Sequence, residues 1–422
     1  MSCVVGIDLG STTTKAVILD ENGNVLGRGI TNSRSNYDLA AAVAKTEAVI
    51  NAKFGLIEQQ VAATETAEAV TILRRAFVME QLLHQLRRLE SLLLEEVEKS
   101  APSHLSAPFR EAIEEICRRI TAEEEAYFRQ PPVLRSDFFR DAVGSAFMRI
   151  AEQIGDPTGV SFDRLVGVYD KCIIRVENEP MDLDFRDHIG DALTRVSNPR
   201  LADAVEYAIA YDLTPAATVG TGYGRARLPF PKEQIRSEIL CHGLGAHAMF
   251  PATRTVLDIG GQDTKAIQVD PEGIVTGFQM NDRCAAGCGR YLGYIADEMS
   301  IGVHELGPLA MQSTKTVKIN STCTVFAGAE LRELMAMGEK REDILAGLHR
   351  AIVIRAMSLL ARSGGVDDEF TFTGGVAKNP AAVRAIRELV QENYGKRTLN
   401  ISAESIYTGA LGAALFANRM VA

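Results

Sequence analysis

DLGSTTTKAVILDENGNVLG, at residues 8–27, recurs as DIGGQDTKAIQVDPEGIVTG at residues 258–277. The two stretches align without a gap at an offset of 250 residues, and nine of their 20 positions are identical. Agreement of this length at one constant offset indicates a duplicated structural unit. Apolar runs separated by Asp, Asn and Gly predict an antiparallel three-stranded meander in each copy. The expected strands are 3–7, 14–19 and 25–30 in the first copy, and 255–257, 264–269 and 274–280 in the second.

The turn after the first strand of each copy has the residue types that bind phosphate. Glycine lets the backbone approach an anion closely, and the exposed N–H groups and small hydroxyls donate hydrogen bonds to phosphate oxygens. The Asp at the end of the strand can hold Mg²⁺ through water, because Mg²⁺ keeps most of its hydration shell. One such turn is often only a hairpin loop. Two copies that face each other can clamp the phosphates of a nucleotide from both sides.

A third glycine-rich turn, TGGVAKNP at residues 373–380, follows an apolar strand expected at 369–372. Pro380 suits the first turn of a helix, because its missing N–H needs no partner there. Farther on, GALGAA at residues 409–414 predicts a helix of small residues that packs closely against backbone. Any one of these glycine-rich turns could be an ordinary loop, but ordinary loops do not explain all of them in this order.

This order of turns resembles the superfamily of actin, sugar kinases and chaperone ATPases, whose two α/β lobes close on ATP. The resemblance implies one phosphate side made of Asp8, Gly10, Ser11, Thr12, Thr13 and Lys15, a second made of Asp258, Gly260, Gly261, Gln262 and Lys265, and an adenosine side made of Gly374, Gly375 and Asn379. We expect Asp8 and Asp258 to organise Mg²⁺. Gln262 is a candidate for orienting the attacking water, a role that Gln has in other nucleotide hydrolases.

The chain between the two copies has a different character. Apolar residues recur every three to four positions from residue 66 to residue 99, which predicts one long amphipathic helix, and a second is expected at 108–128. We therefore expect a first ATPase lobe at 1–60, a helical insertion at 61–213 and a second lobe at 214–422. The insertion is either a decoration of the first lobe or a docking surface for a partner subunit. The glycine-rich stretch 218–225 around Tyr223 is interpreted as a turn, either a hinge or a loop beside the nucleotide.

Composition excludes several classes of protein. The chain has 422 residues, 46% of them hydrophobic, with 45 Lys and Arg against 55 Asp and Glu. This net charge of −10 argues against binding to nucleic acid, which needs a basic face. No apolar run approaches the length of a membrane span, and no basic leader or signal core is present, so we expect a cytoplasmic protein. Seven cysteines are too few and too scattered for a disulfide framework.

Two cysteines lie in polar, glycine-containing stretches. Cys284 precedes a helix expected to start near residue 287, and Cys323 precedes a helix expected at 330–337. The positive end of a helix dipole favours a thiolate, and thiolates bind metals and iron–sulfur clusters. A four-iron cluster usually takes four cysteines, so two chains related by a twofold axis would each supply two. Cys288 is an alternative ligand, although we favour a structural role for it.

The strings DIGGQD, MNDRCAAGCGR, STCTVFAGAE and TGGVAKN resemble those of the ATP-dependent reductase activators. This family contains the activators of 2-hydroxyacyl-CoA dehydratases and the ATP-binding subunits of benzoyl-CoA reductase. The resemblance covers residues 3–60 and 214–420 and implies a [4Fe–4S] cluster shared by two subunits, with Cys284 and Cys323 as ligands. The large insertion, and Cys288 where the short activators usually have Thr, look more like the larger ATP-binding subunit of benzoyl-CoA reductase.

The resemblance therefore implies an ATP-hydrolysing electron-transfer subunit. It would pass low-potential electrons from a ferredoxin-like donor, through the shared cluster, to catalytic subunits that reduce an aromatic acyl-CoA. Its partner at the cluster would be a shorter homologous ATPase subunit or a second copy of the same chain. One alternative is a homodimeric activator of a 2-hydroxyacyl-CoA dehydratase, and another is a small-molecule kinase with the same fold. The histidines, His242 and His247 among them, form no metal-binding pattern and are interpreted as structural.

Overall fold

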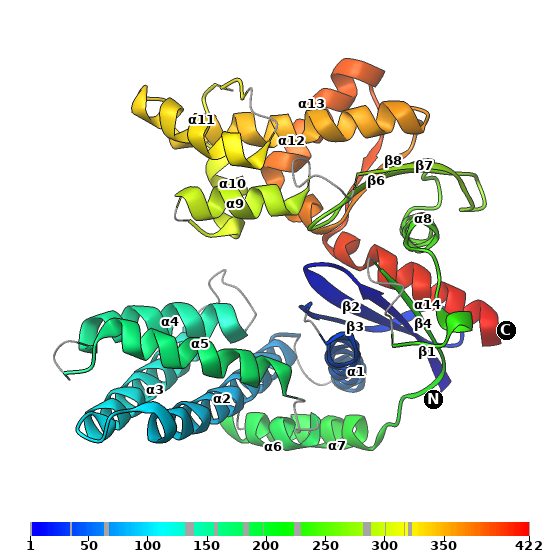
Figure 1. Cartoon of the computed structure of the whole chain (residues 1–422). Helices are drawn as coiled ribbons and strands as arrows, with labels where there is room; N and C mark the ends of the chain where they lie inside the picture. Colours follow the sequence, from blue (N-terminus) through cyan, green and yellow to red (C-terminus); the bar gives the residue numbers. More distant parts are fainter. Residues whose placement is uncertain are drawn as a thin grey trace. The chain divides into compact units, whose positions relative to one another are not determined.

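The duplicated segments form two sheets within one of two compact units. The computed structural model describes residues 2–33, 36–62, 67–130, 139–155, 159–179, 185–196, 198–222, 229–281, 288–299, 301–315, 317–319 and 323–421. Chain contacts divide it into Met1–Val49 together with Leu213–Ala422, called the ATPase unit below, and Ile50–Asp212, called the helical unit (Figure 1).

The first sheet of the ATPase unit has the order β3-β2-β1-β4. β1 (Ser2–Leu9), β2 (Thr13–Leu19) and β3 (Val25–Asn32) are antiparallel, which confirms the predicted meander, and β4 (Thr214–Gly222) lies parallel to β1. In this register Asp8 stands opposite Lys15 on β2 and Thr221 on β4. β4 comes from the part of the chain that was expected to begin the second lobe.

The second sheet repeats this plan in the order β7-β6-β5-β8-β9. Its strands are β5 (Thr255–Ile259), β6 (Thr264–Val269), β7 (Val275–Asn281), β8 (Phe370–Thr373) and β9 (Leu399–Asn400). The first three are antiparallel, and β8 is parallel to β5. Asp258 stands opposite Lys265 and Thr373, so the site at the end of β5 has the same register as the site at the end of β1.

The repeat extends to the fourth strand of each sheet. Thr-Gly stands at the end of both strands, with Gly222 the last residue of β4 and Gly374 the first residue after β8, and the two glycines have positive φ values of 124° and 88°. A Cβ at either glycine would lie 2.3 Å from the carbonyl oxygen of Leu9 or Ile259, at the end of the neighbouring strand. The interpretation of 218–225 as a turn is therefore wrong for 218–222, which belong to β4. Tyr223 lies outside the described residues.

Two helices cross beside the sheets. α14 (Thr408–Val421) packs on the first sheet, and α8 (Glu238–Met249) packs on α14 and on the second sheet (Figure 1). A Cβ on Gly412 would lie 1.8 Å from the Cys241 carbonyl oxygen, and a Cβ on Gly245 would lie 2.0 Å from that of Thr408. Each helix thus places a glycine against a backbone carbonyl of the other helix. These contacts confirm the predicted close packing of 409–414.

Five further helices share one hydrophobic core with the second sheet. They are α9 (Gly289–Met299), α10 (Val303–Ala310), α11 (Thr324–Ala336), α12 (Arg341–Ser363) and α13 (Pro380–Tyr394). Within the described residues, α12 alone has the length and apolar character to cross a membrane, but 61% of its apolar window is buried in the protein. That degree of burial is typical of a core helix. Short 3₁₀ turns occur at Pro199–Leu201, Lys232–Gln234, Gly375–Lys378 and Ala403–Tyr407.

A buried histidine of α12 gives the ATPase unit a pH-dependent stability. His349 Nδ1 donates to the Leu345 carbonyl at 2.7 Å, Nε2 accepts from the Asn379 amide at 2.9 Å, and burial lowers the pKa of the ring to about 4. The unfolded chain binds this proton near pH 6.5, so the stabilisation is complete above that pH and is lost as the pH falls towards 4. We expect the free energy of unfolding to fall by about 2–3 kcal/mol more between pH 7 and pH 4.5 in the wild type than in His349→Gln, as measured by urea titration. Equal losses in both proteins would contradict the assignment.

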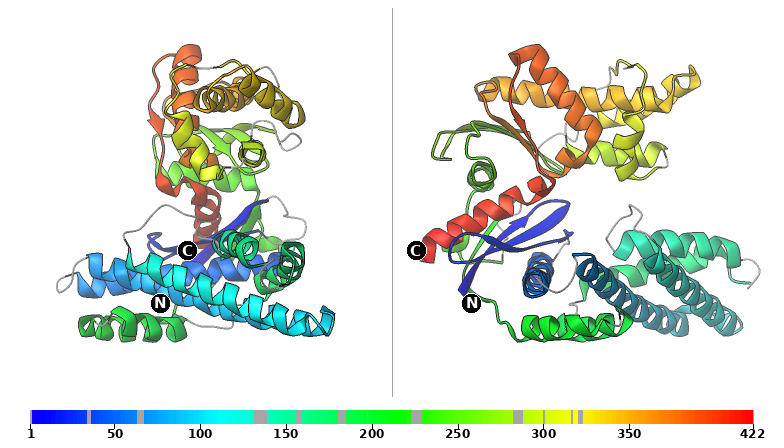
Figure 2. Two further views of the ribbon diagram at one scale, coloured as in Figure 1. Left: turned by 90° about the vertical axis from the view of Figure 1, so that its left-hand side faces the viewer. Right: turned by 180° about the vertical axis from the view of Figure 1, so that it is seen from behind.

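The helical unit is built from amphipathic helices with two hydrophobic cores. α1 (Tyr37–Val61) enters it from the ATPase unit, and the others are α2 (Ala67–Ser100), α3 (Ser106–Arg129), α4 (Phe139–Ile154), α5 (Phe162–Asn178), α6 (Phe185–Val196) and α7 (Ala202–Ala210). α2 confirms the helix predicted at 66–99, and α3 the helix predicted at 108–128. α2 to α5 lie side by side (Figure 2) around one core, whereas Phe54, Phe77 and Phe185 centre the other.

Candidate active site

The two glycine-rich turns meet in the ATPase unit. Asp8 and Asp258 each lie one residue before the end of β1 and β5, and both residues are buried, with 3% and 1% exposed. A Cβ on Gly261 in the second turn would lie only 2.0 Å from the Thr12 hydroxyl oxygen in the first. The structure therefore brings together the two turns that were predicted to hold phosphate from opposite sides.

A buried lysine holds the second turn together. Lys265 Nζ lies 3.3 Å from Asp258 Oδ2, 3.0 Å from Glu238 Oε1 and 2.9 Å from Asp263 Oδ2. Burial by itself would lower the pKa of Lys265, but the three carboxylates raise it above its usual value. Lys265 is therefore a fixed cation that neutralises the site, and its ammonium group is occupied by these carboxylates.

Asp258 uses both carboxylate oxygens within the protein. Oδ1 accepts from the Thr373 hydroxyl at 2.8 Å and lies 3.3 Å from His242 Nδ1, and Oδ2 faces Lys265. Burial would raise the pKa of Asp258, yet the charges of His242 and Lys265 outweigh it and hold this pKa well below its usual range. Because its oxygens are engaged, Asp258 is better placed to orient His242 than to coordinate an ion.

Asp8 has spare binding capacity. Its Oδ2 lies 3.6 Å from Lys15 Nζ, and its Oδ1 is buried without a hydrogen-bond partner among the described residues. A buried carboxylate oxygen without a partner is costly unless a cation or a bound water satisfies it. Of the two Asp residues expected to organise Mg²⁺, Asp8 is therefore the one that fits such an ion.

The remaining predicted site residues differ in exposure and in the hydrogen bonds that they already make within the protein. Ser11 and Thr13 are partly exposed at the first turn, and Gln262 is partly buried beside Gly261 in the second. Gly10 accepts a hydrogen bond from the Ser33 hydroxyl, and Gly260 donates to the Asp263 carbonyl at 2.9 Å. Gly374 and Gly375 lie at the end of β8 as expected. Asn379 caps α13 by accepting from the N–H groups of Ala381 and Ala382, and Pro380 begins that helix as predicted.

Sequence reasoning did not identify three members of the site. Glu238 and His242 stand one turn apart on α8, and Asp263 follows Gln262 in the second turn. Burial raises the pKa of Glu238. Burial alone would lower the pKa of His242, but the Asp258 charge raises it. The signal in the sequence was the Glu-x-x-x-His spacing on a helix, which places both side chains on one face. The interpretation of His242 as purely structural is therefore incomplete.

The candidate cluster ligands lie next to the second turn. Cys323 is exposed at the N-cap position of α11, which begins at Thr324 and not at residue 330 as expected. Cys284 lies outside the described residues. The N–H groups of Gly289 and Arg290, which open α9 five and six residues after Cys284, donate to the Gly260 and Gly261 carbonyls at 2.8 and 2.7 Å. The start of α9 is thus tied to the phosphate turn.

The other described cysteines suit packing better than ligation. Cys288 is fully buried at the start of α9. Burial raises the thiol pKa of Cys241 to about 12, and it raises the thiol pKa of Cys117 and Cys172 as well. A raised pKa disfavours the thiolate that binds metal. Among the described cysteines, exposure makes Cys323 the one that is available to a centre shared with another chain.

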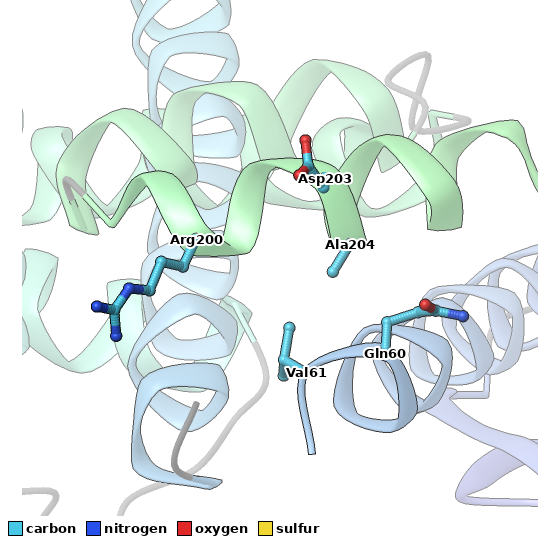
Figure 3. A pocket seen from close by; sticks show the side chains of 5 residues that line it. All are labelled: Gln60, Val61, Arg200, Asp203 and Ala204. Atoms are coloured by element: carbon cyan, nitrogen blue, oxygen red, sulfur yellow. The ribbon is translucent and has the colours of Figure 1, made fainter. Parts of the chain in front are cut away.

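A separate cavity of about 580 Å³ lies in the helical unit. Figure 3 shows its lining, which consists of Gln60 and Val61 at the end of α1 and Arg200, Asp203 and Ala204 around the start of α7. This lining includes none of the residues predicted to bind the nucleotide and none of the cysteines, so the cavity is separate from the site described above.

Comparison with known proteins gives the family. The model of the BadF/BadG/BcrA/BcrD ATPase family matches residues 5–417. The (R)-2-hydroxyglutaryl-CoA dehydratase activating ATPase of Acidaminococcus fermentans is 44% identical over 207 residues, which cover 49% of this chain and 77% of that protein. One of the benzoyl-CoA reductase subunits of Thauera aromatica is 32% identical over 207 residues, 49% of this chain and 72% of that protein.

A solved structure confirms the expected fold class. The crystal structure of the Acidaminococcus fermentans (R)-2-hydroxyglutaryl-CoA dehydratase component A aligns over 100% of this chain and 99% of its own, with a TM-score of 0.57 and 24% identity. The chain has the α/β fold of that component, which is the fold class expected from the sequence, and it contains a large helical unit. The chain belongs to the BadF/BadG/BcrA/BcrD ATPase family.

Proposed function

We propose that this chain is an ATP-hydrolysing activator that delivers low-potential electrons to an enzyme acting on an acyl-CoA thioester. The observation that carries the proposal is the pair of backbone hydrogen bonds from Gly289 and Arg290 to the carbonyls of the second phosphate turn. They join the place where ATP is expected to react to the start of α9, which follows Cys284 by five residues in the sequence. A change in the turn on hydrolysis would move the start of α9.

In this proposal the two turns bind the phosphates of ATP, with backbone N–H groups of Gly10 and Gly261 and the Ser11, Thr12 and Thr13 hydroxyls as donors. Gly260, whose N–H is bonded to Asp263, would let the backbone approach the phosphates closely. Lys15 lies beside Asp8 and adds positive charge. Asp8 would hold Mg²⁺ through water, and Gln262 would orient the attacking water. Bound Mg²⁺ would neutralise the charge that develops on the phosphates. Gly374 and Gly375 would lie by the adenosine.

Cys284 and Cys323 of two chains would together hold one [4Fe–4S] cluster. The exposed N-cap position of Cys323 supports this, because a shared ligand must reach the surface and a helix N-terminus favours a thiolate. When bound, the cluster would supply a one-electron redox centre. A two-state switch of the cysteine helices from 1:99 to 99:1 takes about 5.5 kcal/mol, which equals roughly 230 mV for one electron.

The relatives favour a 2-hydroxyacyl-CoA dehydratase as the client enzyme. The 44% identity to the dehydratase activating ATPase exceeds the 32% identity to the benzoyl-CoA reductase protein, so the reductase assignment that the insertion and Cys288 suggested is the weaker one. We propose a homodimer that acts in the cytoplasm, receives electrons from a ferredoxin-like donor and activates the dehydratase. Size-exclusion chromatography of the native complex separates the two assignments. A stable complex with a shorter homologous ATPase would favour the reductase.

Cys323→Ser tests the electron-transfer proposal. Anaerobically purified wild type should be brown and contain about four iron atoms per dimer, whereas Cys323→Ser should lose most of its iron and colour because a cluster ligand is missing. ATP hydrolysis should persist in the variant, since Cys323 is not part of the phosphate turns. Cys172→Ser, at a buried position of the helical unit, is the control and should keep the iron. A colourless, iron-free wild type that phosphorylates an acceptor would establish the kinase alternative instead.

A further inference from the structure

Three buried side chains at the end of β1 and on α8 converge on one small volume. One ligand atom each of Asp8, Glu238 and His242 lies within 4.8 Å of the other two. The three residues are 3%, 8% and 6% exposed, so solvent contributes little to the environment of these polar atoms. Asp8 comes from the first sheet, whereas Glu238 and His242 come from the helix that packs on the second sheet.

His242 is oriented as a metal ligand is. Its Nδ1 lies 3.3 Å from Asp258 Oδ1, and a carboxylate on that side favours a proton on Nδ1, so Nε2 is the nitrogen that would bind a metal ion. Nε2 lies 4.0 Å from Glu238 Oε1. A histidine whose far nitrogen is held by a carboxylate is the usual arrangement in metal sites.

Gly409 at the start of α14 keeps this volume open. A Cβ built on Gly409 would lie 2.7 Å from His242 Nε2 and 2.9 Å from Asp8 Oδ2. The imidazole nitrogen and the Asp8 carboxylate therefore face the same space from two elements. Asp8 Oδ1, also buried, has no hydrogen-bond partner among the described residues, so this carboxylate has an unfilled coordination position.

The charges around the volume leave a deficit of positive charge. Four carboxylates lie in the site, those of Asp8, Glu238, Asp258 and Asp263, and two ammonium groups face them, those of Lys15 and Lys265. Asp258 favours the protonated form of His242, and a metal ion on Nε2 would displace that proton. With the imidazole then neutral, two negative charges remain. Buried charges of one sign are costly unless they are paired or coordinate a metal, and one divalent cation would restore balance.

We infer that Asp8, Glu238 and His242 bind one divalent transition-metal ion directly, without nucleotide. Bonds of about 2.0–2.2 Å place ligand atoms roughly 3–4 Å apart. The three ligand atoms here lie within 4.8 Å of one another, so small movements would bring them to an ion. An imidazole nitrogen favours a first-row transition ion over Mg²⁺, which prefers oxygen ligands and its own water. This ion is distinct from the Mg²⁺ that accompanies ATP. The inference adds to the nucleotide site and does not depend on the proposed electron transfer.

Mn²⁺ is the probe for this site. The full-length protein, free of nucleotide, should bind one Mn²⁺ per chain, and pulsed electron paramagnetic resonance should show coupling of the ion to a ¹⁴N nucleus. His242→Gln should lose that coupling and bind Mn²⁺ at least about tenfold more weakly, the scale seen when the support of a metal site is removed. His247→Gln, five residues farther along α8 and packed against Gly273, is the matched control and should behave as wild type.

The wild-type spectrum decides the question even where a variant folds poorly. Failure to bind Mn²⁺ without nucleotide, or binding without nitrogen coupling, would overturn the inference. Coupling that survives in His242→Gln would assign the nitrogen to another residue and overturn it as well. Iron content, measured on the same samples, reports on the proposed cluster separately, so the two proposals fail independently.

Discussion

Lys265→Met should lower the free energy of unfolding at pH 7 by about 3–5 kcal/mol, the usual cost of removing one partner from a buried charge cluster. The variant leaves the carboxylates of Asp258, Glu238 and Asp263 facing one another without the ammonium group that neutralises them. Their mutual repulsion should raise their pKa values, so the difference from wild type should shrink as the pH falls and they bind protons. Urea unfolding followed by circular dichroism suits a chain without Trp.

Lys15→Met is the matched control because the duplication places Lys15 at the same position in the first copy. Lys15 pairs with Asp8 at 3.6 Å and has 13% of its side chain exposed, compared with 2% for Lys265. Its loss should cost less than that of Lys265, about 1–3 kcal/mol, because Lys15 faces one carboxylate where Lys265 faces three. Equal effects of the two substitutions would show that the three-carboxylate cluster is not the source of the stability.

Gly412→Ala should destabilise the ATPase unit by about 1–3 kcal/mol or more, because the new methyl group has no space. Its Cβ would lie 1.8 Å from the Cys241 carbonyl oxygen, and backbone cannot rotate away as a side chain does. α14 and α8 must then separate. Since α8 carries Glu238 and His242, we also expect ATP hydrolysis to fall, and steady-state phosphate release measures this.

Gly293→Ala is the control, because it replaces a helical glycine without affecting the contact between α8 and α14. Gly293 lies inside α9, and a Cβ there would meet nothing within 4 Å. Ala is a better helix former than Gly, so this variant should gain about 0.5–1 kcal/mol. A Gly412→Ala protein as stable as the wild type would show that the two helices do not need this close approach.

The two phosphate turns could be predicted because each is a local feature repeated in the sequence. Asp8 and Asp258 share one register, and a strand that ends in Asp-x-Gly needs no distant residue to form its turn. The long helix α2 was predictable for a similar reason, since its buried leucines recur with helical spacing. In both cases the pattern that decides the structure lies within a few residues.

The parts that could not be predicted depend on distant contacts. β4 reads TPAATVGTG, and its glycines hide the strand signal, which comes instead from parallel pairing with β1 about 200 residues earlier. Lys15 and Lys265 occupy equivalent positions, yet only Lys265 meets Glu238, because α8 brings that carboxylate to the second sheet. Asp263 stands where the first copy has Thr13, so the additional charge is visible in the alignment, but its partner is not.

The contact between α8 and α14 also shows where the two halves of this repeated protein must differ. When the equivalent residues Gly245 and Gly412 are superposed, His242 and Gly409 occupy the same position in the two helices. The imidazole of one helix needs the bare backbone of the other, since a methyl group at 409 would collide with it. Two identical halves could not satisfy that requirement. Asymmetry at this one pair of positions therefore follows from steric fit, since position 409 must stay Gly for as long as position 242 carries the imidazole.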